Sequence, residues 1–145
     1  MNIGKRLVKT PKLYFTDTGL ASHLCGFDDW EQVERQGQAG TVVETWVAGE
    51  LRKLAGLGVK RTEIHFWRTH AGREVDFLLV RGNRLVAIEV KWTQRVTAHD
   101  IGNILACSED LKGKLGLAVI LYSGQTTVVL NERVAAVPFG AFFAG

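Results

Sequence analysis

Cysteine and proline are scarce in this sequence, which has two of each among its 145 residues. Cys25 and Cys107 lie far apart and in no C-x-x-C spacing, so the sequence supports neither a zinc knuckle nor a disulfide framework. Chains without disulfides are typical of reducing compartments. We therefore expect a cytoplasmic protein.

The sequence also lacks the segments that mark membrane proteins and common nucleotide-binding enzymes. No apolar run is long enough to cross a bilayer, so we expect no membrane association. Neither a G-x-x-x-x-G-K-[ST] phosphate loop nor a G-x-G-x-x-G motif occurs, which excludes these two devices for binding nucleotides. The four histidines show no H-E-x-x-H or other metal-ligand spacing.

The length and composition predict one globular domain that spans residues 1–145. Hydrophobic residues make up 46% of the chain, which is enough for a core, and 145 residues are too few for two comfortable domains. Lys and Arg outnumber Asp and Glu by 18 to 15. The resulting charge of +3 permits a nucleic-acid partner but does not by itself argue for one.

The hydrophobic pattern predicts an α/β fold in the order helix, three strands, helix, and one or two further strands. The first helix is expected to begin at Thr41, where Thr41-x-x-Glu44 has capping-box form, and to end at Gly56 and Gly58. The second helix is expected after Thr97, its N-cap, with Asp100 three residues on. The strand candidates are residues 64–69, 75–80, 85–92, 115–124 and 126–131.

The two ends and the first connection are expected to carry less regular structure. The cations Lys5, Arg6, Lys9 and Lys12 are interpreted as a solvated leader that enters a short strand and a turn at residues 17–19. Residues 27–40 are polar and are interpreted as a connection that has room for a helical turn. The tail from residue 134 is expected to pack as a short terminal element.

The second and third strand candidates place charged residues where hydrophobic ones would suit a core. A tight turn at Gly82-Asn83 pairs Val80 with Leu85 in an antiparallel hairpin, and this register sets Asp76 opposite Glu89. It also sets Glu74 opposite Lys91, with all four charged side chains on one face by strict alternation.

Two carboxylates in that position repel each other, because opposed Cβ atoms are about 4.5 to 5.5 Å apart. A divalent cation would offset the repulsion, since Mg²⁺ needs only one or two carboxylates from a protein and keeps its remaining waters. We therefore predict that Asp76 and Glu89 bind Mg²⁺ or Mn²⁺. Lys91 beside them would orient or deprotonate a water, or counter the charge that develops on a phosphate.

These residues carry a resemblance to a known superfamily. "VD" at residues 75 and 76, "EVK" at 89–91 and an upstream helix with Glu44 resemble the PD-(D/E)XK nucleases. The segments "KTPKLYFTDTGLASHL", "GTVVETWVAGEL", "FWRTHAGREVDFLL" and "IEVKW" are similar to a domain of unknown function at the C-terminal end of many bacterial and archaeal AAA-type ATPases.

The resemblance implies a restriction-endonuclease-like fold, in which a central mixed sheet with an antiparallel meander is flanked by helices. It implies that Asp76 and Glu89 are metal ligands, Lys91 the catalytic lysine and Glu44 an accessory acid. Val75 stands where the superfamily name has proline, which supplies no ligand. The resemblance also implies that the chain is the C-terminal part of a larger ATPase.

Each of these residues also has a structural interpretation. Glu44 would complete the Thr41 capping box, although it aligns with the inner side of its helix, and Glu50 is a second acid that could approach the hairpin. Lys91 would form a cross-strand salt bridge with Glu74, and Asp76 and Glu89 would lie on a solvated sheet face. Leu78 and Ala87 on the same predicted face favour the clustered site over the solvated one.

Two functions follow from these alternatives. One is a Mg²⁺-dependent nuclease that hydrolyses phosphodiester bonds of DNA or RNA through Asp76, Glu89 and Lys91. The other is a non-catalytic module that binds nucleic acid or protein as an accessory of an AAA-type ATPase. The presence of all three groups favours the nuclease.

Overall fold

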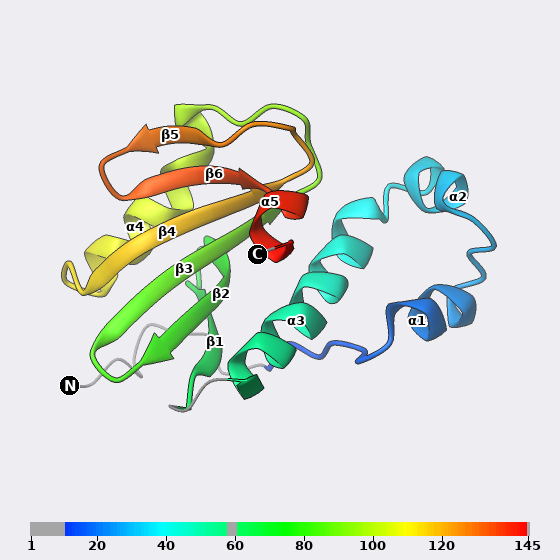
Figure 1. Ribbon diagram of the computed structural model, residues 1–145, viewed down its shortest axis with the longest axis horizontal. Coiled ribbons are helices and arrows are strands. Elements are labelled where there is room, and N and C mark those ends of the chain that lie inside the picture. The colour runs from blue at the N-terminus through cyan, green and yellow to red at the C-terminus, as the bar shows by residue number, and fades with distance from the viewer. Residues whose placement is uncertain (1–10, 58–60, 145) are drawn as a thin grey trace.

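A computed structural model describes residues 11–57 and 61–144. The chain forms a six-stranded mixed sheet flanked by helices, which confirms the α/β class (Figure 1). The strand order is β1-β2-β3-β4-β6-β5. The strands are β1 (Glu63–Arg68), β2 (Glu74–Arg81), β3 (Arg84–Lys91), β4 (Leu115–Tyr122), β5 (Val128–Asn131) and β6 (Val134–Pro138).

Strands β1 to β3 form the predicted antiparallel meander, and the hairpin has the predicted register. Val80 pairs with Leu85, and the ladder runs from Arg81 and Arg84 to Phe77 and Ile88. Gly82 adopts a φ of 60° in the connecting turn, a conformation that favours glycine. Strand β4 then pairs parallel with both β3 and β6, and β5 closes the far edge antiparallel to β6.

Two helices cover opposite faces of this sheet. Helix α3 (Ala39–Leu57) buries Val43, Val47 and Leu51 against the inner strands on one face. Helix α4 (Gly102–Asp110) buries Ile104 and Cys107 on the other face. The short 3₁₀ helix η2 (Ala98–Ile101) precedes α4 and carries the predicted Thr97 and Asp100 capping box.

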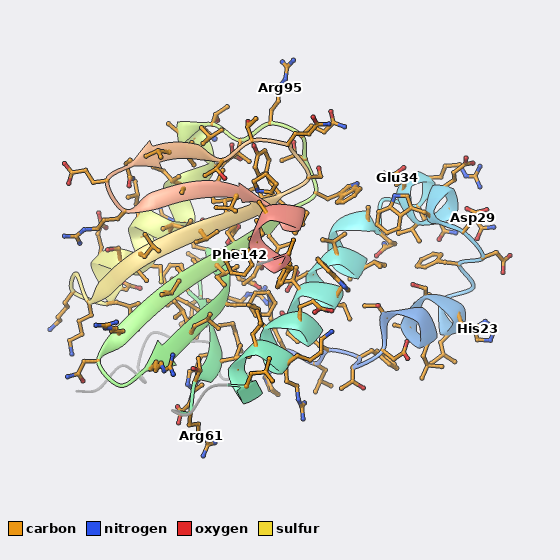
Figure 2. The ribbon with its side chains drawn as sticks, in the orientation of Figure 1. His23, Asp29, Glu34, Arg61, Arg95 and Phe142 are labelled. Carbon is orange, nitrogen blue, oxygen red and sulfur yellow. The ribbon has the colours of Figure 1, made fainter. Side chains whose placement is uncertain are left out.

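Three further helices complete the described chain. Helices α1 (Thr18–Leu24) and α2 (Trp30–Arg35) lie on the side of α3 away from the sheet (Figure 1). Helix α5 (Phe139–Phe143) follows β6, and Figure 2 shows Phe142 between the sheet and α3. Within residues 11–57 and 61–144, no helix has both the length and the apolar character needed to cross a bilayer.

One sequence prediction about the ends of the fold is wrong, and two others describe less regular structure than is present. The predicted turn at residues 17–19 begins α1, because the carboxylate of Asp17 accepts the N–H of Leu20 and caps the helix. The predicted connection at residues 27–40 contains α2, capped in the same way by Asp29. The tail supplies β6, whose parallel pairing with β4 adds a full strand to the sheet.

Candidate functional site

The N-terminal part of β2 contains a bulge that determines where the acidic residues point. His65 of β1 pairs with Leu78 and Trp67 pairs with Val75, so two residues of β2, Asp76 and Phe77, lie opposite one residue of β1. A bulge of this kind interrupts the alternation of side chains. Val75 accordingly packs in the core under α4, whereas Phe77, two residues on, packs under α3.

The bulge corrects the prediction that four charged side chains share one sheet face. Asp76 points to the α3 side, where its Oδ1 lies 3.5 Å from the Nζ of Lys12. The backbone N–H of Val90 donates to Asp76 Oδ2 at 2.8 Å. Because N–H groups of a strand lie in the plane of the sheet, the Asp76 carboxylate takes the place of a ladder acceptor beside β3. The Asp76 carboxylate therefore lies next to the backbone of the segment from Glu89 to Lys91.

Glu89 is the only charged residue that is buried among the described residues, with 7% of its surface exposed. It lies on the α4 side, where its charge acts on the thiol of Cys107. Its Oε1 is 3.6 Å from the Nζ of Lys91, and its buried Oε2 has no hydrogen-bond partner in the described part of the chain. An unpaired buried carboxylate oxygen costs free energy unless a cation or donor satisfies it.

The environment raises the pKa of both carboxyl groups. Burial raises the pKa of Asp76 to about 6, and the negative charge of Glu44 adds to this, while the Val90 N–H and Lys12 oppose it. Burial also raises the pKa of Glu89 to about 7, and the charge of Asp76 adds to this, while Lys91 opposes it. The two acids thus act on each other electrostatically from the two sides of the β2–β3 hairpin.

Glu44 does not form the capping box that was considered for it. Helix α3 begins at Ala39, two residues before Thr41, so Glu44 lies inside the helix and its backbone N–H needs no side-chain cap. Its Oε1 accepts hydrogen bonds from Lys12 Nζ at 2.8 Å and from the Tyr14 hydroxyl at 2.6 Å. Glu50, the other candidate, pairs with Lys53 instead.

Glu74 pairs with cations other than the predicted Lys91. Its carboxylate forms an ion pair with Lys12 and another with Arg68 at 3.4 Å. Ligand oxygens of Glu44, Glu74 and Asp76 all lie within 4.8 Å of one another. The structure therefore gathers three carboxylates on the α3 side of the hairpin and leaves Glu89 and Lys91 on the other side.

The sequence pattern does not mark Lys12 as a site residue, because it groups Lys12 with a solvated leader. Only 21% of its side chain is exposed, and it contacts all three of those carboxylates. The other leader cations, Lys5, Arg6 and Lys9, lie outside the described residues. The sequence signal for Lys12 is its position two residues before Tyr14, because alternate side chains of an extended segment point the same way. Both residues face Glu44, whereas Leu13 between them is 92% exposed.

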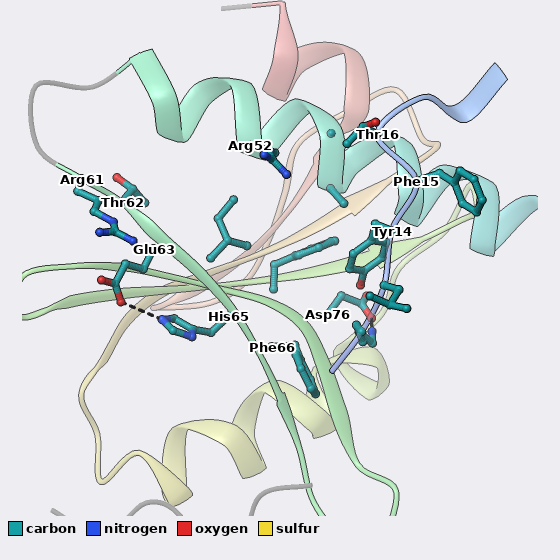
Figure 3. A pocket seen from close by; sticks show the side chains of 16 residues that line it. Tyr14, Phe15, Thr16, Arg52, Arg61, Thr62, Glu63, His65, Phe66 and Asp76 are labelled. Atoms are coloured by element: carbon teal, nitrogen blue, oxygen red, sulfur yellow. Dashed lines mark hydrogen bonds and ion pairs between the residues drawn. The ribbon is translucent and has the colours of Figure 1, made fainter. Parts of the chain in front are cut away.

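A cavity of about 790 Å³ opens beside Asp76 on the α3 side of β1 and β2. Figure 3 shows Tyr14 next to Asp76 at one end, with Arg52 from α3 and Arg61 before β1 farther along the cavity. His65 also lines the cavity and is bonded to Glu63 at 3.1 Å. Each end of the cavity thus carries charges of both signs, with Asp76 and Lys12 at one end and Glu63 and Arg61 at the other.

Comparisons with known proteins place the chain in a family. Residues 39–142 match the family described as domain of unknown function DUF4143. The chain belongs to the DUF4143 family. This DUF4143 domain is also 33% identical over 137 residues to uncharacterized proteins of Mycobacterium bovis and Mycobacterium tuberculosis. The match covers 94% of this chain and 29% of each relative, so the chain spans less than a third of their length.

Proposed function

We propose that this DUF4143 domain is a divalent-metal-dependent nuclease that hydrolyses phosphodiester bonds of DNA or RNA. The observation that carries the proposal is the buried Glu89 carboxylate, whose Oε2 has no partner among the described residues and whose neighbour Asp76 is a second acid. The resemblance of Asp76, Glu89 and Lys91 to the PD-(D/E)XK pattern supports the same function.

Carboxylate oxygens suit Mg²⁺ and Mn²⁺, and both ions retain waters when the protein supplies few ligands. Asp76 and Glu89 would hold the ion, with Asp76 offering Oδ2, the oxygen that faces β3, while its Oδ1 stays with Lys12 on the α3 side. When bound, it supplies positive charge against the phosphate oxygens and lowers the pKa of water. An ion there would also satisfy Glu89 Oε2 and offset the repulsion between the two acids.

The remaining charged residues have roles that follow from their positions. The Lys91 ammonium lies 3.6 Å from Glu89 on the α4 side, where it can orient the attacking water or counter charge on the phosphate. Arg52 and Arg61 line the cavity that begins at Asp76. Guanidinium groups suit the phosphates of a nucleic-acid backbone, and this favours a polynucleotide over a small phosphodiester.

The test is cleavage of single- and double-stranded DNA and RNA in Mg²⁺ or Mn²⁺, with and without a chelator. We expect Asp76→Asn, Glu89→Gln and Lys91→Ala each to abolish cleavage. The matched control is Glu132→Gln, because Glu132 is exposed in the turn between β5 and β6, at the edge of the sheet opposite β1. Cleavage that persists in Lys91→Ala would show that another group performs the chemistry.

A second candidate function is a binding module within a larger ATPase protein of the AAA type. The observation that favours it is the length of the mycobacterial relatives, of which the matched region is only 29%. Exposed apolar residues at Leu13, Phe15, Leu20 and Leu24 offer a surface for such a neighbour. Binding of nucleic acid measured by fluorescence anisotropy, without cleavage in any metal, would favour this module over the nuclease.

A further inference from the structure

Lys12 occupies the centre of the acidic group on the α3 side. Its Nζ lies 2.8 Å from Glu44 Oε1 and 3.5 Å from Asp76 Oδ1, and it forms a third ion pair with Glu74. The rings of Tyr14 and Phe66 flank it, with centroids 6.0 and 5.9 Å from Nζ. An ammonium group with three carboxylate partners and two aromatic neighbours is held in one place.

The three carboxylates by themselves have the dimensions of a cation site. Their ligand oxygens lie within 4.8 Å of one another, which is the spacing of oxygens around one divalent ion with bonds of about 2.0 to 2.6 Å. The Nζ of Lys12 contacts all three of these carboxylates.

Asp76 is the residue that the two halves of the site share. Its Oδ1 faces Lys12, and its Oδ2 faces β3, where Glu89 and Lys91 are located. The Tyr14 hydroxyl holds Glu44 toward Lys12 at 2.6 Å, and Arg68 holds Glu74 at 3.4 Å. Glu44 and Glu74 are thus paired on the α3 side, whereas Glu89 Oε2 has no partner among residues 11–57 and 61–144.

We propose that Lys12 is a positioning residue that fills one cation position and so limits the centre to a single divalent ion at Asp76 and Glu89. In this arrangement Lys12 neutralises Glu44 and Glu74 and serves in place of a second metal ion. The single-ion part of the proposal rests on the proposed function. The statement that Lys12 fills the cation position among Glu44, Glu74 and Asp76 rests on the Lys12 contacts alone.

The experiment is calorimetric titration of Mn²⁺, with no substrate, into wild type and Lys12→Met, checked for folding by circular dichroism. We expect one ion in wild type and two in Lys12→Met, with the second lost again in the double variant Lys12→Met/Glu74→Gln. Lys53→Met is the matched control, because Lys53 also pairs with an acid of α3 but lies outside the cluster, and it should bind one ion.

Each outcome decides between the two proposals. One ion in both wild type and Lys12→Met overturns the role of Lys12 and leaves the nuclease intact. A third outcome is no ion in wild type and one ion in Lys12→Met that is lost when Glu74→Gln is added. This result supports the role of Lys12 and overturns the metal centre at Asp76 and Glu89. If Lys12→Met is unfolded without metal, Mn²⁺ should refold it by replacing the lost cation, and failure to refold overturns the proposal.

Discussion

Replacing Glu89 with glutamine is expected to stabilise the metal-free protein at pH 8 and to change its stability little at pH 5. The reason is the burial of Glu89, whose carboxyl group has a pKa of about 7 in the folded protein against an ordinary value of 4.5. The folded state therefore binds the proton more tightly than the unfolded state. The stability that this provides is complete below pH 4.5 and is lost as the pH rises through about 7.

The magnitude follows from the difference between the two pKa values. One pKa unit corresponds to about 1.4 kcal/mol, so Glu89 alone removes roughly 2 to 3 kcal/mol from the free energy of unfolding between pH 5 and pH 8. Glutamine has no charge to bury and lacks this dependence. For a chain of this size, the difference at pH 8 amounts to roughly 5 to 10 °C in melting temperature.

The assay is urea unfolding in a chelator at half-unit steps from pH 5 to pH 8, with Glu132→Gln as the exposed control. The curves of wild type and Glu89→Gln should separate as the pH rises, whereas Glu132→Gln should follow wild type. Adding Mn²⁺ at pH 8 should reverse the order if Asp76 and Glu89 bind the ion as proposed, because only wild type keeps both carboxylates. Parallel curves for wild type and Glu89→Gln would refute the claim that Glu89 bears a buried charge.

Three further predictions concern other parts of the molecule. Lys91→Ala should retain Mn²⁺ affinity within a few-fold in calorimetry while losing the proposed cleavage, since Lys91 is not one of the two proposed ligands. A loss of both would mean that Lys91 organises the metal site. Leu121→Ala should lower the free energy of unfolding in urea by about 2 to 5 kcal/mol, because Leu121 is fully buried in β4. Leu117 lies on the same strand but is 47% exposed, so Leu117→Ala should lower it by about 1 kcal/mol or less. In a thiol-reagent assay Cys25 should react at once and Cys107 only on unfolding, because Cys107 is buried and its pKa is raised to about 12; equal rates would contradict the packing of α4.

The central sheet could be predicted because its signals are local. The Gly82-Asn83 turn and the flanking apolar runs determine the register of β2 and β3, and the observed pairing of Val80 with Leu85 confirms it. The Thr97 cap is likewise a short-range pattern, with its partner Asp100 three residues away. In both cases the residues that determine the structure lie within a few positions of each other.

The elements that were missed depend on more distant partners. The segment from Val134 to Pro138 is short and rich in alanine, so its own strand propensity is low. It becomes a strand because β4 offers an unpaired edge with a buried apolar face, with which Ala136 pairs opposite Ile120. The start of α1 was missed for another reason, since the Asp17 cap uses the same residue types as a turn.

The site shows most clearly why spacing alone is insufficient. Strict alternation placed Asp76 on the same face as Leu78, and it would be correct for an unbroken strand. One extra residue in β2 turns Asp76 toward Glu44 and Lys12, which lie 32 and 64 positions away in the sequence. No periodicity reveals a bulge in advance, because the bulge is defined by the pairing with β1.

The bulge also gives a physical reason for the charged residues in a strand pair built for a core. In a regular ladder Asp76 would lie on the face of Leu78 and add its charge to that of Glu89 on the same side. With the bulge, Asp76 accepts the N–H of Val90 and faces Lys12, so the two acids are near enough to influence each other but are supported by different cations. Removing Lys12 should therefore change the α3 side of the site first, and removing Lys91 should change the side of Glu89.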